Sequence, residues 1–475
     1  MTPLPVDFSG PSEAPRGTVR SFFSDPRYRR IVSAVISGGA ARILSSSLTL
    51  ISLPLAVRYL GAERYGVWAT VASIAVWINL LDLGIANSLT NAISRAFARQ
   101  DLAEAARAFT NALAVTCGAA VLAGGAFLLI ARRVNWIAVF NASPRVSNEI
   151  WWTLLVAVLI MLIGLPLNLM SKVLAGYQEL HTYNQAVGTG AVCSLLGLAF
   201  GVWLRVSMPM LFLLSFGSIA AVNCGLFVWV VGWHKPWLRP RAKYLSANTA
   251  RELLSSGWAF LLIQIAAIVV FSSDNIVVAH YLGAAEVTPY SVTWRVVGLG
   301  TILQSLLFPA LWPAYAEAQA RGDVMWIRRT FSAAMRGTVA LNVAWAATLI
   351  VFGRLAIRLW AGPAAVPPLS LITAMALWGI IGATTTAQSC LLGALNRMRT
   401  QAVLSVMAAA LNLAISLVLV TRIGSLGVIL GTIISYIVVL VVPQTVIVGS
   451  TLRELKETGA QPTVPPVAEP SAGAW

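Results

Sequence analysis

Two arginines stand inside long apolar segments of the sequence, where a charge is costly unless it meets water, a carboxylate or an anionic ligand. The first belongs to a polar stripe with the spacing i, i+3, i+4 and i+7, which places its members on one face of a helix: Arg42, Ser45, Ser46 and Thr49. The second, Arg295, lies within a later apolar segment. A guanidinium presents a fork of donors that suits a phosphate. We therefore predict that these five residues line a central, water-accessible cavity and bind an anionic group.

Each arginine also has a structural interpretation. Arg42 could snorkel to lipid phosphates while the neighbouring hydroxyls pack against other helices. Arg295 could form a salt bridge with Asp82 or Asp274, the acidic residues well inside apolar segments. Either aspartate could titrate and couple to ion movement, but we favour a structural role for both.

The sequence contains no pattern typical of an enzyme. It has no P-loop, nucleophile elbow, HExxH motif or paired-carboxylate loop. Its three histidines are far apart, and its four cysteines lie in apolar segments without CxxC spacing. We expect no catalytic residues, no cofactor and no metal.

The composition of the 475-residue chain is that of a membrane protein. Hydrophobic residues make up 58% of it and charged residues 11%, whereas soluble proteins are about half apolar and a quarter charged. The net charge of +16 could suggest nucleic acid, but the cations are scattered between apolar segments and form no patch with stacking aromatics. We expect an integral protein of the lipid bilayer that binds no nucleic acid.

Twelve apolar segments approach the length of about 20 residues that a helix needs to cross the hydrocarbon core. The chain is therefore predicted to be an all-α membrane protein with about 12 transmembrane helices. The segments lie near 34–57, 66–90, 108–131, 151–171, 184–204, 209–233, 255–280, 287–313, 331–353, 367–391, 400–421 and 424–449. The predicted regions are a basic cytoplasmic segment at 1–33, spans 1–6 at 34–233, a cytoplasmic linker at 234–254, spans 7–12 at 255–450, and a disordered cytoplasmic tail at 451–475.

The charges between the spans predict the orientation. If the N-terminus is cytoplasmic, most of the 33 lysines and arginines fall in cytoplasmic segments, as the positive-inside rule requires. The loops around Arg99, Arg239 and Arg328 would be cytoplasmic, and those around Arg64, Arg145 and Arg358 external. An even number of spans then places both termini in the cytoplasm.

Two stretches of sequence recur at one offset. "YLGAERYGVW" begins at Tyr59 and "YLGAAEVTPYSVTW" begins at Tyr281, 222 positions later. "ARQDLAEAARAFTNAL" and "ARGDVMWIRRTFSAAM" keep this offset and align Asp101 with Asp323. Because the repeat covers six spans, both copies enter the membrane from the same side. This predicts two six-helix lobes related by a parallel internal repeat, as in transporters that alternate access by rocking their lobes.

Residues 58–101 resemble the polysaccharide-biosynthesis membrane proteins, which include the O-antigen and exopolysaccharide flippases. A leucine–glycine pair, an E-x-Y-G turn and a D-L-G sequence carry the resemblance: Leu60, Gly61, Glu63, Tyr65, Gly66, Asp82, Leu83 and Gly84. It extends through "GYQ" at 176–178 into the second lobe. The resemblance places the chain in a superfamily with multidrug and toxin extrusion transporters and lipid II flippases, which have two six-helix lobes around a central cavity.

The resemblance implies a substrate and a location. The substrate would be an oligosaccharide on a polyprenyl pyrophosphate carrier, moved from the cytoplasmic to the outer leaflet of a bacterial inner membrane. Candidate protein partners are a polymerase or a chain-length regulator. A multidrug or cation antiporter of the same fold and a lipid II flippase stay open as alternatives. A membrane polysaccharide polymerase is disfavoured, because the largest external gap spans only about twenty residues.

Overall fold

The computed structural model describes residues 26–77, 81, 85–320, 322–395 and 397–458. Every regular element in these ranges is a helix, as the sequence predicts. Ten of the described helical segments are long and apolar enough to cross a membrane. Two expected spans, 66–90 and 287–313, are not among the ten. The first includes residues outside the described ranges, and the second is divided at Leu299–Thr301 into two shorter helices with many polar side chains.

The first half of the chain forms helices that are apolar except near their ends. In chain order they are α2 (Pro26–Trp77), α3 (Ile85–Ala98), α4 (Leu102–Ala131), α5 (Trp136–Phe140), η2 (Pro144–Val146), α6 (Ser147–Leu167), α7 (Leu169–Gly176), α8 (Leu180–Trp203), α9 (Met208–Trp229) and η3 (Val230–His234). Two short turns, η4 (Pro236–Leu238) and η5 (Ala242–Tyr244), follow. They lie in the predicted linker.

The second half also consists of helices. It consists of α10 (Ala247–Ser272), α11 (Asp274–Leu282), α12 (Ala284–Gly298), η6 (Leu299–Thr301), α13 (Ile302–Ala320), α14 (Val324–Trp360), η7 (Pro363–Ala365), α15 (Leu369–Ala394), α16 (Met398–Ile423), α17 (Ser425–Ser435), η8 (Tyr436–Val441) and α18 (Val442–Thr458). Helix α18 extends into the predicted tail at 451–475. The rest of that tail lies outside the described residues.

Helix junctions in the two halves use matching backbone conformations. Asp101 caps α4 by accepting the backbone N–H groups of Ala103 and Glu104, and Asp323 caps α14 in the same way through Trp326. Residues with a positive φ, which break a helix and favour glycine, also recur in pairs. The pairs are 222, 222, 221 and 219 positions apart: Gly61 and Gly283, Gln100 and Gly322, Asn141 and Gly362, and Arg205 and Gly424.

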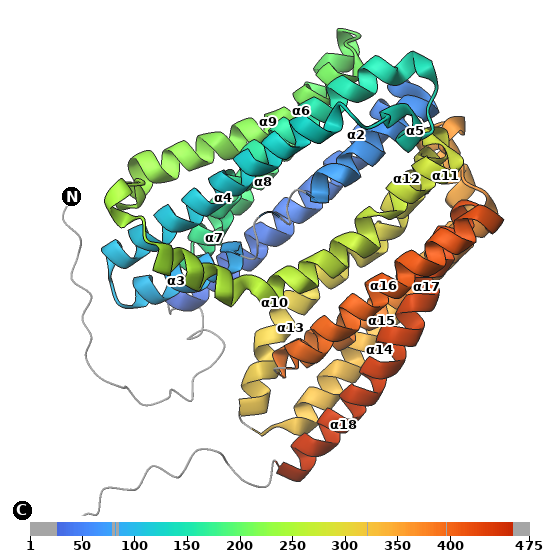
Figure 1. Ribbon diagram of the computed structural model, residues 1–475. Coiled ribbons are helices and arrows are strands. Elements are labelled where there is room, and N and C mark those ends of the chain that lie inside the picture. The colour runs from blue at the N-terminus through green and yellow to red at the C-terminus, as the bar shows by residue number, and fades with distance from the viewer. Residues whose placement is uncertain (1–25, 78–80, 82–84, 321, 396, 459–475) are drawn as a thin grey trace, which may run out of the picture.

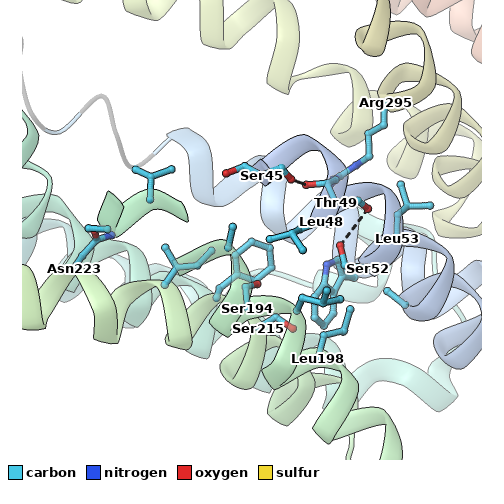
Figure 2. A pocket seen from close by; sticks show the side chains of 18 of the residues that line it. Ser45, Leu48, Thr49, Ser52, Leu53, Ser194, Leu198, Ser215, Asn223 and Arg295 are labelled. Carbon is cyan, nitrogen blue, oxygen red and sulfur yellow. Dashed lines mark hydrogen bonds between the residues drawn. The ribbon is translucent and has the colours of Figure 1, made fainter. Parts of the chain in front are cut away.

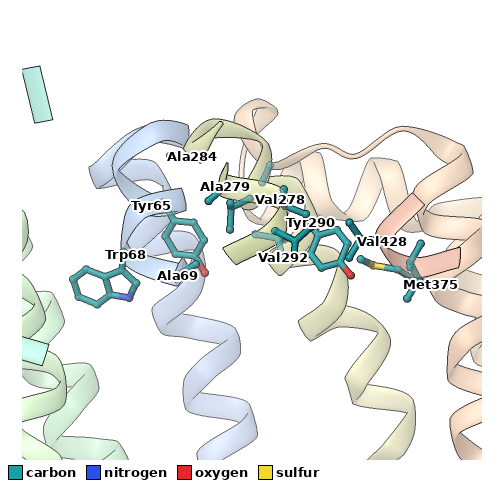
Figure 3. Packing of buried hydrophobic residues seen from close by; sticks show 14 of the residues in the cluster. Tyr65, Trp68, Ala69, Val278, Ala279, Ala284, Tyr290, Val292, Met375 and Val428 are labelled. Carbon is teal, nitrogen blue, oxygen red and sulfur yellow. The ribbon is translucent and has the colours of Figure 1, made fainter. Parts of the chain in front are cut away.

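The two halves meet at one end and diverge at the other. In Figure 1 they converge where α5, α11 and α12 lie, and they separate toward α3 and α18. The largest buried cluster draws on both halves and includes Tyr65, Trp68, Ala284, Tyr290 and Val428, which Figure 3 shows side by side. Of the two other core clusters, one uses residues of 85–254 and the other residues of 308–448. The shared core therefore lies at the convergent end.

Hydrogen bonds also join the halves at this end. The Thr288 hydroxyl donates to the carbonyl oxygen of Ala62 over 2.6 Å. The Arg58 guanidinium donates to the carbonyl oxygens of Leu359 and Trp360 at 2.8 and 3.1 Å.

Large apolar side chains cover the outside of the bundle. Val121, Leu122 and Leu129 on α4 are each about three-quarters exposed. Water would make such a surface unfavourable, whereas lipid chains are a matching solvent for it. The outer surface therefore agrees with a multi-pass membrane protein.

Candidate functional site

A cavity of about 460 Å³ is lined mainly by residues of the first half. Its walls are α2, α8, α9 and the start of α7, and Arg295 of α12 reaches it from the other half (Figure 2). Among the described residues that line it, Arg295 is the one that carries a charge. The remaining lining alternates apolar side chains with hydroxyls and amides, a composition usual for small-molecule sites.

The polar stripe predicted from the sequence lies on this wall in part. Ser45, Thr49 and Ser52 of α2 line the cavity. The Thr49 hydroxyl donates to the Ser45 carbonyl oxygen at 2.8 Å, and the Ser52 hydroxyl donates to the Thr49 carbonyl oxygen at 3.2 Å. The hydroxyl hydrogens of Thr49 and Ser52 are thus used by the helix, and their oxygen lone pairs stay available as acceptors. The Ser45 hydroxyl has no hydrogen-bond partner among the described residues. Arg42 and Ser46 lie on the same helix, but their side chains are outside the described residues.

Arg295 lies at the boundary between the two halves. Besides the cavity, it lines a smaller pocket of about 180 Å³ with Thr49 and Leu53 of α2 and Trp360 of α14. Its side chain is exposed, and no described carboxylate forms an ion pair with it. The guanidinium therefore keeps its five donors available to an anion.

Asp274 does not pair with Arg295. It begins α11, is 4% exposed, and its Oδ2 accepts a hydrogen bond from the Tyr290 hydroxyl at 2.6 Å. Its Oδ1 has no partner among the described residues. Asp274 thus connects α11 to α12 across the bend at Gly283. Asp82, the other candidate partner, lies outside the described residues.

The described residues of the E-x-Y-G turn shape the convergent end of the cavity. Gly61 takes a positive φ of 74° and bends α2. Glu63 accepts the backbone N–H of Ser143 at 2.6 Å, which fixes the loop after α5. Tyr65 is 2% exposed in the shared core and lines the cavity. Gly66 lets α2 approach α12, because a Cβ there would lie 1.6 Å from the carbonyl oxygen of Ala284.

Several polar lining residues were not predicted from the sequence. They lie at the start of α7 and in α8 and α9: Asn168, Tyr183, Ser194, Ser215 and Asn223. Ser215 and Asn223 lie about two helical turns apart on α9. The helical spacing of polar residues was therefore the signal in the sequence that could have indicated them. Two isolated positions do not stand out in a helix of this composition.

The described residues offer no metal site. No group of three or more His, Cys, Asp or Glu side chains comes together among them. The cavity chemistry is therefore that of a binding site with one cation and several neutral hydrogen-bonding groups.

Solved transporters share the fold. The structure superposes on an inward-facing multidrug resistance MATE family transporter of the MOP superfamily with a TM-score of 0.74 and 16% identity, covering 88% of this chain and 99% of that one. An outward-facing MATE structure gives a TM-score of 0.59 at 14% identity, covering 89% and 97%. These values establish a MATE-like fold.

Curated relatives are bacterial. A "Putative O-antigen transporter" of Salmonella typhi is 23% identical over 296 residues, which cover 62% of this chain and 67% of the relative. A "Putative O-antigen export protein" of Yersinia pseudotuberculosis is 23% identical over 290 residues, covering 60% of this chain and 65% of that protein. The chain thus spans about two thirds of the length of these relatives.

The family comparison agrees with the solved structures and with the curated relatives. The sequence profile described as "Polysaccharide biosynthesis protein" matches residues 31–319, more than half of the chain. Transport, rather than catalysis, is the role that the relatives and the fold share. The chain therefore belongs to the polysaccharide biosynthesis protein family, as a multi-pass membrane transporter with a MATE-like fold.

Proposed function

We propose that the protein flips a polyprenyl-pyrophosphate-linked oligosaccharide from the cytoplasmic to the outer leaflet for surface polysaccharide synthesis. The family and the printed names of its relatives support this class of substrate. The observation that carries the proposal is the position of Arg295, a cation without a described acidic partner at the cavity between the halves. A pyrophosphate would supply the missing negative charge.

The proposed architecture has twelve spans in two six-helix lobes, residues 34–233 and 255–450. The segment from the Gly61 bend to Ala98 and the pair α12–α13 would supply the two spans beyond the ten. The recurring caps and positive-φ residues support a parallel repeat. An axis along the membrane normal would let the lobes rock about the convergent end and expose the cavity to each side in turn.

Arg295 would bind the pyrophosphate together with Arg42 of the first lobe. A bidentate guanidinium–phosphate contact is stronger than a neutral hydrogen bond and fixes orientation. Ser45, Ser46 and Thr49 would add hydroxyl contacts beside it. One arginine from each lobe would let substrate binding favour one arrangement of the lobes over the other.

Two of the three alternatives are less well supported than the proposal. A multidrug or cation exporter would need a carboxylate for its cationic substrate, and the described residues of this cavity offer none. A lipid II flippase would use similar pyrophosphate chemistry, so only the identity of the sugar separates it from the proposal. A membrane polymerase would need an external domain between spans. The connection from α4 to α6 consists only of α5, η2 and short turns.

The proposed location is a bacterial cytoplasmic membrane with both termini inside. The divergent end, near Arg99 and Arg328, would then face the cytoplasm, and the convergent end, near Arg64 and Arg145, the outside. A surface polymerase or a chain-length regulator would act next on the flipped product. Impermeant thiol labelling of single cysteines placed at Arg239 and Arg145 tests the orientation, and labelling at position 239 in intact cells would reverse it.

Surface polysaccharide in cells that lack the native protein tests the function. Arg295→Ala should reduce the polymer roughly ten- to a hundredfold, the range of one lost charge-assisted hydrogen bond or more. Arg295→Lys keeps the charge but loses the planar pair of N–H donors that contact a phosphate, so it should retain partial function. Arg422→Ala, an exposed arginine in the last turn of α16 outside the described cavities, is the matched control. Normal polymer with Arg295→Ala in correctly inserted protein would overturn the proposed site.

A further inference from the structure

The second half contains a larger cavity of about 980 Å³, formed by α10, α12, η6, α13, α15, α16 and η8. We propose that this cavity binds the uncharged sugar rings of the substrate while Arg295 holds the pyrophosphate. The inference rests on the proposed function and assigns the two chemical parts of one substrate to two cavities. It is carried by the lining, which combines an aromatic wall, a polar wall and an unsatisfied buried amide.

Four aromatic rings from four elements form the first wall. Trp294 and Trp378 stack with their centroids 6.1 Å apart and an interplanar angle of 16°. Tyr436 meets Trp378 edge-on at 4.5 Å, and Phe271 lies 6.1 to 6.2 Å from the other three rings. The negative face of such a ring attracts polarised C–H groups. A pyranose presents these groups on one side and its hydroxyls around its edge.

The remaining lining supplies hydrogen bonds without charge. It includes Gln304, Ser305, Thr385, Thr386, Ser389, Gln401 and Ser405, and none of the described lining residues is ionised. Several of these groups are held in place. The Gln401 amide donates to the Ser389 carbonyl oxygen at 2.8 Å, and Gln444 donates to the Ser389 hydroxyl at 3.3 Å. A neutral, hydroxyl-rich ligand matches this wall better than a cation or an anion does.

Gln304 is the residue that distinguishes a binding site from ordinary core packing. It is 3% exposed, and its Nε2 has no hydrogen-bond partner among the described residues. A buried donor without an acceptor is unfavourable, so such a group commonly marks a ligand or water position. An acceptor supplied by a sugar hydroxyl would satisfy it. A purely hydrophobic function for the cavity would leave it unsatisfied.

The two cavities adjoin in a way that suits a two-part ligand. Arg295 lines both the first cavity and the small pocket between the halves, and Gly298 lines that pocket and the larger cavity. Trp294, next to Arg295 in sequence, belongs to the aromatic wall. A pyrophosphate at Arg295 would therefore have its attached sugars within reach of the larger cavity. Its volume also lies near the upper end of the usual range for ligand sites, about 300–1,000 Å³.

Two lipid probes, one with sugars and one without, distinguish binding of the sugars from binding of the pyrophosphate. The full-length protein in lipid nanodiscs is titrated with polyprenyl pyrophosphate and with polyprenyl-pyrophosphate-linked oligosaccharide extracted from cells that lack the flippase. Gln304→Leu and Trp294→Phe should weaken binding of the sugar-bearing probe. For Gln304→Leu the loss of affinity should be roughly tenfold, the value of one good hydrogen bond. Both should leave the sugar-free probe unchanged. Gln388→Leu is the matched control, because Gln388 is also a buried amide but is not among the lining residues.

The outcomes distinguish this inference from the proposed function. Arg295→Ala should weaken both probes, because both carry the pyrophosphate. If Gln304→Leu weakens both probes equally, or neither, the sugar site is wrong even when Arg295→Ala behaves as expected. If Arg295→Ala changes neither probe while Gln304→Leu weakens the sugar-bearing one, the sugar site stands and the pyrophosphate site is wrong. A wild-type protein that binds neither probe overturns both.

Discussion

Gly66 of α2 lies against Ala284 of α12 so closely that a Cβ on Gly66 would be 1.6 Å from the Ala284 carbonyl oxygen. The contact joins the two halves at their shared core. Gly66→Ala should therefore force the helices apart and destabilise the protein by about 1–3 kcal/mol, the usual cost of overpacking, or more. Thermal unfolding of the purified protein measures this. Gly118→Ala is the control, because nothing lies within 4 Å of that position. An unchanged melting temperature for Gly66→Ala would contradict the close packing.

Substitutions in the buried pair of Asp274 and Tyr290 can distinguish a structural role of Asp274 from a role in coupling transport to ion movement. Tyr290→Phe removes the donor to Oδ2 and leaves a buried carboxyl without a described partner, so we expect a loss of about 1–3 kcal/mol. Asp274→Asn keeps an acceptor for Tyr290 and should retain transport if the role is structural. Surface polysaccharide and unfolding are measured on the same variants. A stable but inactive Asp274→Asn protein would instead support a coupling role.

Glu179 lies between α7 and α8, and its interactions should make the folding stability of the protein depend on pH. Burial alone would raise the pKa of this carboxyl, but hydrogen bonds from Lys235 at 2.9 Å and His234 at 2.8 Å, with their charges, hold the pKa below its ordinary value of 4.5. A lowered pKa in the folded state means that the stabilisation is fully present above the ordinary value and is lost as the pH falls through the lowered one.

The matching experiment compares Glu179→Gln with the wild type by thermal unfolding. The variant should be less stable at neutral pH, where Lys235 is left buried with a 5% exposed side chain, and the difference should shrink in acid. Glu454→Gln, which breaks an exposed pair with Arg397, should have little effect at any pH. A constant difference across the pH range would refute the role of the Glu179 charge.

Closing the convergent end covalently should stop transport if the halves rock. Cysteines at Ala62 and Thr288 replace residues joined by a hydrogen bond between α2 and α12. With the four native cysteines removed, a short thiol cross-linker between them should abolish surface polysaccharide, and a cleavable cross-linker should restore it after reduction. Each single-cysteine variant serves as the control. Full transport in the cross-linked protein would rule out opening at this end.

Features that depend on local sequence were predictable. Apolar runs predicted most of the helices that are long and apolar enough to cross a membrane. The glycine turns of the sequence repeat both adopt a positive φ, at Gly61 and Gly283, a conformation that few other residues take. The arrangement of two lobes as a parallel repeat stays a prediction. The period of the α2 stripe placed Ser45 and Thr49 on one face, and both line the cavity. Whether any of these residues binds substrate stays a prediction.

Features that depend on distant contacts were not predictable. Asp274 can accept a hydrogen bond from Tyr290 because the chain bends at Gly283. No rule of sequence spacing predicts this pair. The aromatic wall brings together Phe271, Trp378 and Tyr436 from helices far apart in sequence. Individually, each looks like one more apolar side chain in a span. Only the packing of α10, α15 and η8 makes them one surface.

Movement of the substrate across a bilayer is the direct test of the proposed flippase function. The purified protein is reconstituted in liposomes that carry a polyprenyl-pyrophosphate-linked oligosaccharide in the inner leaflet, and an impermeant glycosidase outside reports its arrival. We expect the wild type to expose the sugar and Arg295→Ala to slow its exposure roughly tenfold or more, with Arg422→Ala at the wild-type rate. If the wild-type protein exposes the sugar no faster than protein-free liposomes do, the proposed flipping activity is wrong.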